Sequence, residues 1–423
     1  MKTKKWMAAL AVVATTAALA GCSTTASNAG STGTGVVKLS FWEGYTAGDG
    51  VELQKLVKQF NASQSHIQIT MHTKTWAVIE STVLPALAAK NGPDILASPP
   101  DVMTVYASQG VLQPLTDFYS NKSNDTAELN QSALEMSELK GTNYAVPLGF
   151  VPLTMFYNKT EFAKAGITTF PKTWAQWVTD AKKLTIQTGT GTPSQYGLAL
   201  PDHQTVGNGV WTSLFESGGG DVIKNGKDVV INSAANKATL TYWTNAVTKD
   251  HISPIGLSGI DADNLFTAGK AAMEAGGPWL ASSCVTAKIS CGIAPIPAGP
   301  KGVAESGIGV TAGVTSQASA AKKAAAETFF AWFFKHKQSV AWAIGSGWPP
   351  LNTSVTASEV ASSTEVKELT EQSKYTKPLL PGVVNQVDVI TALDTLTQKA
   401  FAGGNIPSLL TQAEASMKTA IAK

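Results

Sequence analysis

Short apolar strands alternate with amphipathic helices where the folded part of the chain begins. Residues 36–41 have the composition of a strand, and the apolar residues that follow repeat at the spacing of one helical face: Leu53, Leu56, Val57 and Phe60. A second strand is expected at 67–71. A second helix then ends near Asn91-Gly92-Pro93, and a third strand is expected at 94–97. This alternation predicts a parallel, helix-covered sheet and therefore an α/β fold.

The rest of the chain reads as helices separated by short strands. Thr173 is placed to cap a helix that runs through Trp174, Trp177 and Leu184. Further helices are expected at 234–249, 319–335, 387–402 and 408–421, with strands near 196–200, 271–274, 292–296 and 308–312. About 390 residues are enough for two domains, but no Pro- or Ser-rich linker divides them. We therefore expect the chain to cross between two lobes more than once.

The first 35 residues have the pattern of a secretion and anchoring segment. Three lysines precede a short apolar run that ends at Leu19-Ala20-Gly21-Cys22. The run is too short for a stable transmembrane span, and the cysteine after a small-residue cleavage point resembles the lipobox of bacterial lipoproteins. We expect residues 1–21 to be a lipoprotein signal peptide. Cys22 would then carry a lipid anchor outside the cytoplasmic membrane, with residues 22–35 as a flexible tether. The alternative is an ordinary secretory signal with an incidental cysteine.

The charged residues argue against two classes of partner. All 32 basic residues are lysine, and removal of the signal peptide leaves 29 lysines against 30 acidic residues. A nearly neutral chain is not drawn to nucleic acid or to anionic lipid. Arginine, the residue that grips phosphate with two parallel hydrogen bonds, is absent. The sequence therefore points away from nucleic acid and from a phosphorylated ligand.

The use of cysteine fits an oxidising compartment. With Cys22 taken by the lipid, Cys284 and Cys291 remain, and we expect them to form a disulfide that contributes about 2–3 kcal/mol. Two buried free thiols are the alternative. A zinc site would need further cysteine or histidine ligands, and none lies close by in the sequence. We expect no metal and no cofactor.

Motifs of the common enzyme classes are absent from the sequence. It contains no G-x-S-x-G elbow, no H-E-x-x-H, no P-loop, and no G-x-G-x-x-G after a strand. Asp261 and Asp263 would suit the carboxylate pair of a glycosidase, but we interpret them as solvated loop acids. The protein is therefore not expected to be an enzyme.

The eleven tryptophans point to the kind of ligand. Four stand beside glycines or at the expected end of a strand: Trp42, Trp211, Trp279 and Trp348. Four others fall within helical patterns and are assigned to the core: Trp174, Trp177, Trp332 and Trp342. Indole rings stack on the apolar faces of sugars, while neighbouring polar groups bind the hydroxyls. The first group therefore predicts a neutral, polar ligand.

A series of short blocks occurs in a familiar order. The blocks are Phe41-Trp42-Glu43, Phe60-Asn61, Pro93-Asp94-Ile95, Pro147, Phe156-Tyr157-Asn158-Lys159, Pro171-Lys172-Thr173-Trp174, Gly269-Lys270-Ala271-Ala272-Met273, Gly277-Pro278-Trp279 and Gly345 to Pro350. In these blocks the chain resembles the extracellular solute-binding proteins of carbohydrate ABC importers, in the branch of the maltose-binding and glycerol-phosphate-binding proteins. The resemblance covers nearly all of the mature chain.

The resemblance implies an α/β, two-lobed, periplasmic-binding-protein-like fold of type II, with the ligand cleft between lobes that three crossings join. The first lobe would comprise residues 36–147 and 305–347, and the second 148–304 and 348–423. Such lobes close over the ligand by hinge bending, and the closed form docks on the membrane subunits of the ABC permease. A monomer is expected.

The resemblance also implies binding residues. Trp279 matches a ring-stacking tryptophan of the maltose-binding branch, and Asp101 falls where that branch has an acid. Ser98 and Asn208 stand where it has aromatic residues. Val151 stands where that branch has an acid, and residues 387–390 lack the tryptophan that it has there. Both differences from the maltose-binding branch argue against a maltodextrin as the ligand. The candidate ligand-binding set is Trp42, Glu43, Ser98, Asp101, Asn208, Trp211, Gly277, Trp279 and Trp348.

These expectations combine into one functional hypothesis. The protein would be a lipid-anchored, extracytoplasmic receptor that delivers a sugar, with an oligosaccharide favoured, to an ABC importer. Two other functions stay open at this point: a surface carbohydrate-active hydrolase, and a binding protein for a small polyol.

Overall fold

The computed structural model describes residues 35–46, 48–189, 191–372 and 376–422, without the side chains of Thr205, Val206, Asn208 and Ser282. The expected signal peptide, Cys22 and all of the tether except Gly35 lie outside the described residues. Within the described part, no helix is both long and apolar enough to cross a membrane.

The first lobe is built on a mixed sheet, in which the described residues form six strands in the order β13-β12-β3-β1-β2, with β6 also paired to β12. Their bounds are β1 Val37–Glu43, β2 Ile67–Thr73, β3 Ile95–Ser98, β6 Ala145–Pro152, β12 Glu305–Val314 and β13 Thr376–Pro378. β1 runs parallel to β2 and β3, while β12 runs antiparallel to β3 and β6. The predicted parallel start of the sheet is thus confirmed, and the returning strand β12 makes the sheet mixed.

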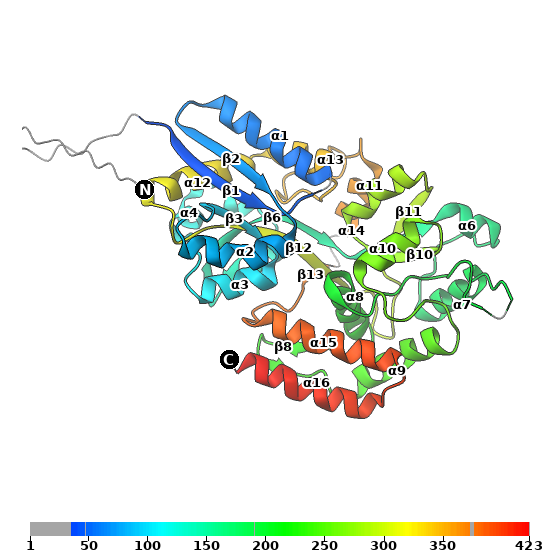
Figure 1. Ribbon diagram of the computed structural model, residues 1–423. Helices are drawn as coiled ribbons and strands as arrows, with labels where there is room; N and C mark the ends of the chain where they lie inside the picture. The colour runs from blue at the N-terminus through cyan, green and yellow to red at the C-terminus, as the bar shows by residue number, and fades with distance from the viewer. Residues whose placement is uncertain (1–34, 47, 190, 373–375, 423) are drawn as a thin grey trace, which may run out of the picture. The chain divides into compact units, whose positions relative to one another are not determined.

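Helices cover this sheet (Figure 1). In α1 (Gly48–Ser63) the predicted stripe of Leu53, Leu56, Val57 and Phe60 is buried. The other helices and short elements of this lobe are α2 Trp76–Ala88, α3 Pro100–Ser108, α4 Thr116–Ser120, η1 Lys122–Asn124, η2 Thr126–Glu128, α5 Gln131–Glu135, the strands β4 Glu138–Leu139 and β5 Thr142–Asn143, α12 Ala320–Phe333 and α13 His336–Ser346.

The second lobe has a smaller antiparallel sheet in which β7 (Thr154–Asn158) lies between β10 (Met273–Gly276) and β11 (Cys291–Ala294). Its other elements are α6 Lys159–Lys164, α7 Trp174–Leu184, α8 Gln204–Ser217, β8 Ile223–Lys224, β9 Asp228–Val229, α9 Ala234–Thr248, α10 Gly259–Thr267, α11 Pro278–Ala287, α15 Gln386–Phe401 and α16 Ile406–Ile421. Thr173 caps α7 as predicted, because its hydroxyl accepts the N–H of Gln176. The strand expected at 196–200 is present only as single bridges, such as Tyr196 with Ala271.

The chain passes between the two sheets at defined points. β6 continues through Leu153 into β7, and β11 leads back into β12. The third passage follows Gly347, whose positive φ of 85° ends α13 in a conformation that favours glycine. The α/β architecture with two lobes therefore matches the expectation.

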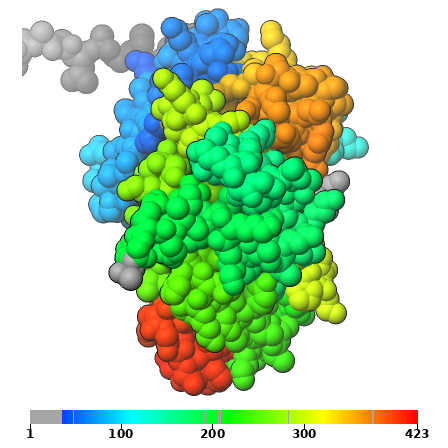
Figure 2. Space-filling model, turned by 90° about the vertical axis from the view of Figure 1, so that its right-hand side faces the viewer, coloured from blue at the N-terminus to red at the C-terminus, as the bar shows by residue number. Residues whose placement is uncertain are grey.

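The segment that follows the third passage differs from the predicted lobe boundary at residue 348. Trp348, Leu351 and Leu369 belong to the hydrophobic core of the first lobe, and β13 joins its sheet. The core of the second lobe takes up the chain again at Leu380. Within this segment, α14 (Thr364–Gln372) packs against α11 and β11, so the segment coloured orange in Figure 2 lies beside the green and yellow-green surface of the second lobe.

Candidate binding site

Glu43 ends β1 with its side chain inside the protein. It is fully buried, and its carboxylate accepts the N–H of Tyr45 (2.7 Å) and the hydroxyl of Thr73. Burial raises the pKa of Glu43, while these two hydrogen bonds partly oppose that rise. Both carboxylate oxygens already have protein donors, so Glu43 shapes the loop after β1 rather than presenting a free carboxylate.

Aromatic side chains gather around that loop. Tyr45 meets Trp76 and Trp348 edge-on, with ring centroids 5.7 and 6.0 Å apart. Gly44 permits this, because a Cβ there would lie 2.2 Å from the Trp76 ring. Trp76, at the first position of α2, is partly buried and was missed by sequence reasoning. In the sequence it follows a polar stretch that gives no sign of a binding residue. It comes close to the loop after β1 only because β2, which precedes it, pairs with β1.

Trp348 lies against the same group of rings and is largely buried. Its indole Nε1 donates to Oδ2 of Asp49 in the first turn of α1 (3.4 Å). Its ring also lies against the backbone of Gly149 on β6, where an added Cβ would come within 2.5 Å. The third crossing thus places Trp348 near the end of β1, where the ring is almost completely buried in the first-lobe core.

Trp42 has a different environment from the one expected. It is only 8% exposed and packs in a small core with Ile79, Leu96 and Met103. The Lys74 ammonium lies 3.9 Å from its ring centroid, which is a cation–π contact. Core packing and Lys74 therefore already use the ring faces, and this placement does not favour Trp42 as a stacking surface.

Ser98 and Asp101 lie at the end of β3 and the start of α3. Ser98 is buried, and its hydroxyl has no hydrogen-bond partner among the described residues. Asp101 is half-buried in the first turn of α3, and this burial raises its pKa. One turn further on, the Thr104 hydroxyl donates to the backbone oxygen of Val384, just before α15. The start of α3 therefore contacts the second lobe.

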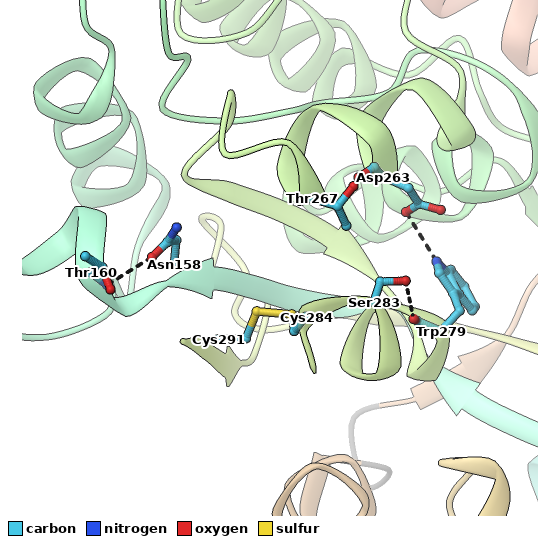
Figure 3. The surroundings of a disulfide bond; sticks show 8 residues. All are labelled: Asn158, Thr160, Asp263, Thr267, Trp279, Ser283, Cys284 and Cys291. Atoms are coloured by element: carbon cyan, nitrogen blue, oxygen red, sulfur yellow. Dashed lines mark hydrogen bonds between the residues drawn. A yellow bond between two sulfur atoms is a disulfide. The ribbon is translucent and has the colours of Figure 1, made fainter. Parts of the chain in front are cut away.

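Trp279 stands in the first turn of α11 in the second lobe and is half-buried. Figure 3 shows its indole directed at Asp263, and Nε1 donates to Oδ1 of that residue at 3.2 Å. Its ring also covers Gly277, where an added Cβ would lie 2.4 Å from it. The order Gly277-Pro278-Trp279 therefore has a physical reason: the glycine makes room for the ring, and the proline starts the helix.

Asp263 and Asp261 were interpreted as solvated loop acids, and for Asp263 that was wrong. Both lie in α10, where Asp261 completes a capping box with Ser258. Asp263 instead faces Trp279 and Glu274 of β10, which is fully buried. Burial raises the pKa of Glu274 well above its ordinary value, and the charge of Asp263 adds to that rise.

The predicted disulfide is present and lies at the other end of α11. Cys284 in the last turn of the helix is bonded to Cys291, the first residue of β11 (Figure 3). Cys284 is buried beside Phe156, Phe266 and Leu280. The bond ties α11 to the edge of the sheet, so it helps to hold the helix that carries Trp279.

Trp211 was predicted to stack on the ligand, and the structure places it in the core instead. It is fully buried in α8 against Phe215 and Phe401, and its Nε1 donates to the backbone oxygen of Pro201 (3.1 Å). Gly207 and Gly209 disguise the apolar face of this helix in the sequence. Asn208 belongs to the same helix, but its side chain lies outside the described residues.

The two groups of site residues approach each other at the third crossing. A Cβ built on Gly347 would lie 3.4 Å from the side chain of Pro278, so the residue before Trp348 adjoins the residue before Trp279. Tyr45, Trp76 and Trp348 form the first-lobe group, and Gly277 and Trp279 the second. Within the described residues, no group of three or more histidine, cysteine or acidic side chains could hold a metal ion.

This fold defines a class: two α/β lobes joined by crossing strands, with aromatic rings where the lobes meet. The bacterial extracellular solute-binding protein family matches residues 44–340, and the chain belongs to that family.

The chain is also similar to individual proteins of known kind. The galactooligosaccharide-binding protein of Bacillus subtilis (strain 168) is 26% identical over 328 residues, which are 74% of this chain and 73% of that protein. The cyclic alpha-maltosyl-1,6-maltose binding protein from Arthrobacter globiformis superposes with a TM-score of 0.79 at 22% identity, over 92% of this chain and 99% of that one. UgpB from Mycobacterium tuberculosis, in complex with glycerophosphocholine, reaches 0.79 at 19% identity, over 92% and 99%. The structural likenesses establish the fold alone.

Proposed function

We propose that the protein is an extracytoplasmic receptor that binds a neutral sugar, with an oligosaccharide favoured, and delivers it to the membrane subunits of an ABC importer. The observation that carries the proposal is the half-buried Trp279 ring, held at the start of α11 beside the third crossing, with Tyr45, Trp76 and Trp348 gathered on the other lobe. Tyr45 and Trp348 are largely buried, so the partly exposed rings of Trp76 and Trp279, one on each lobe, are the ones that suit the apolar faces of sugar rings.

The relatives support this ligand class over a phosphodiester. The Bacillus subtilis relative is named for galactooligosaccharide, whereas UgpB shows that the same fold also accommodates glycerophosphocholine. Arginine is absent from this chain, and the acidic side chains around the site that are not fully buried are Asp49, Asp101 and Asp263. Acidic groups repel a phosphate and accept hydrogen bonds from sugar hydroxyls.

The carboxyl groups at the site do not suit a glycoside hydrolase. A hydrolase needs two carboxyls about 5–10 Å apart on opposite sides of the bond that it cleaves. Asp263 and Glu274 instead contact each other, and Glu274 is fully buried. This arrangement supports binding without chemistry.

We also propose that Cys22 carries the lipid anchor, that the protein acts as a monomer, and that the two lobes close on the ligand.

The test is a melting-temperature screen of the purified mature protein against mono-, di- and oligosaccharides and polyols, followed by titration calorimetry of every hit. A ligand at a hundredfold excess over Kd stabilises the folded state by about 2.7 kcal/mol. Trp279→Ala should lower the affinity for the sugar about tenfold or more, because ring contacts at binding sites contribute about 1–3 kcal/mol.

Trp332→Ala is the matched control. Trp332 is also partly buried, but it packs on α12 against Phe60 and Phe329, so the variant should lose stability and keep its sugar affinity. The proposal fails if no saccharide raises the melting temperature, or if a polyol alone does. Release of reducing ends from a glycan by the pure protein would support the hydrolase instead.

A further inference from the structure

Trp279, the ring expected to contact the sugar, is hydrogen-bonded to one acidic side chain, which in turn interacts with a second. Trp279 Nε1 donates to Asp263 Oδ1 at 3.2 Å (Figure 3). The side chain of Asp263 is in turn within hydrogen-bond contact of Glu274. Asp263 is half-buried on α10, whereas Glu274 is fully buried on β10, where its backbone bridges to Ala199. The helices α11 and α10 and the strand β10 thus bring an indole and two carboxyls together.

Two carboxyls that hydrogen-bond directly to each other share a proton, because one of them must donate it. Among the described residues, no N–H or O–H group donates to either oxygen of Glu274. Ionised carboxylates only accept hydrogen bonds, so Asp263 and Glu274 can bond to each other only if one of them is protonated. Glu274 is the fully buried one and has no other donor among the described residues, and burial raises its pKa well above its ordinary value. Burial also raises the pKa of Asp263, but hydrogen bonds with Glu274 and with the Trp279 indole oppose that rise and favour its charged form.

We propose that Glu274 donates its proton to Asp263, that Asp263 accepts the indole N–H of Trp279, and that this chain of hydrogen bonds positions the Trp279 ring for the sugar. The inference rests on the proposed function, because Trp279 binds the sugar only under that proposal. Asp263 and Glu274 are then positioning residues that act through Trp279. The indole has a fixed orientation before the ligand arrives, which reduces the entropy lost on binding.

The charged groups around this pair are mostly acidic. The elements packed against β10 carry Tyr157 on β7, Glu216 on α8 and Asp261 on α10, and the adjacent segment carries Tyr196, Asp202 and His203. Lys270 precedes β10, and α11 contributes no titratable group among its described residues, since Cys284 is in the disulfide. Among the described residues, neither basic group forms an ion pair with Asp263 or Glu274, and His203 pairs with Asp202 instead. Glu216 and Asp202 therefore make loss of the shared proton harder, whereas Asp261 is exposed and water screens its charge.

The shared proton makes sugar affinity dependent on pH. When Glu274 ionises at high pH, two carboxylates meet in a largely buried place and repel each other. Asp263 must then move, and the bond from the Trp279 indole to Asp263 is lost. We expect the affinity of the wild-type protein to fall about tenfold once the pair has lost its proton, a change equivalent to one hydrogen bond to a charged group.

Glu274→Gln is the decisive variant, because its amide N–H₂ donates permanently to Asp263 and has no proton to lose. Its sugar affinity should match the wild type at neutral pH and stay constant across the alkaline range in which the wild type weakens. Asp263→Ala should weaken binding about tenfold at every pH, because the bond from the indole to Asp263 is then lost. Asp261→Asn is the matched control: it changes a helix-capping acid two residues from Asp263 and should keep the wild-type pH profile.

A second readout needs no sugar. In protein labelled with ¹⁵N-tryptophan, the indole N–H resonance of Trp279, assigned by its absence from Trp279→Phe, should titrate with pH in the wild type and stay constant in Glu274→Gln. If no saccharide binds, the proposed function fails, but this titration of the indole resonance still tests whether Asp263 and Glu274 share a proton. Equal pH dependence in wild type and Glu274→Gln, by resonance or by affinity, would overturn the shared proton while leaving the receptor function standing.

Discussion

A carboxyl buried where the chain crosses between the lobes should make stability depend strongly on pH. Glu305 begins β12 and is almost completely buried. Its Oε1 accepts the N–H of Ile296 (3.1 Å) and lies 3.2 Å from the hydroxyl of Thr154. The other oxygen, Oε2, has no partner among the described residues. Burial raises the pKa of Glu305 from 4.5 to about 7, and those two hydrogen bonds only partly oppose the rise.

The sign and size of this dependence of stability on pH follow from proton linkage. Because the folded state keeps its proton above pH 4.5, where the unfolded chain loses it, the stabilising effect of Glu305 is fully present at low pH. It is lost as the pH rises to about 7. A shift of that size corresponds to about 3 kcal/mol in the free energy of unfolding. Glu305→Gln removes the titration and keeps an oxygen for Ile296, so this variant should not show the loss.

The assay is urea unfolding of both proteins at several pH values between about pH 5 and about pH 8. The unfolding free energy of Glu305→Gln minus that of the wild type should increase by about 2–3 kcal/mol across this range. Glu371→Gln, an exposed acid on α14, is the control for a change of charge alone. A difference that stays constant with pH, or that changes equally in the control, would refute the reasoning.

Two further predictions test structural assignments. Trp211→Ala should lower the free energy of unfolding by about 3–5 kcal/mol, because it leaves a cavity in the second-lobe core. Its sugar affinity, titrated well below the melting temperature, should remain that of the wild type; a loss of affinity without a loss of stability would return Trp211 to the site. Replacing Cys284 and Cys291 together by serine should cost about 2–3 kcal/mol of stability in urea unfolding, and a variant as stable as the wild type would show that the bond contributes nothing.

The sequence predicted the fold well where a pattern repeats along one element. The spacing of Leu53, Leu56, Val57 and Phe60 identified α1, and the cap at Thr173 identified the start of α7. These signals are local, since a helix face or a cap is complete within a few residues. The segment at 196–200 carried a strand pattern but forms only single bridges, because it lies beside β10 without a full ladder.

The candidate site was predicted less completely, because its residues meet only through tertiary packing. Trp279 stood out by its block with Gly277, and its environment agrees with a place at the site. Trp211 misled because glycines interrupt the apolar pattern of α8. Trp76 and Glu274 were missed, and Asp263 was taken for a solvated loop acid, because the partners of all three lie on other elements.

The central claim is that two lobes close on a sugar with the Trp279 ring against it. Crystal structures of the mature protein with and without a bound oligosaccharide test this most directly. The account predicts that the lobes rotate toward each other in the complex, with a sugar ring stacked on Trp279 and further rings or hydroxyls beside Trp348. Two superimposable structures, or a sugar bound away from Trp279, would contradict it.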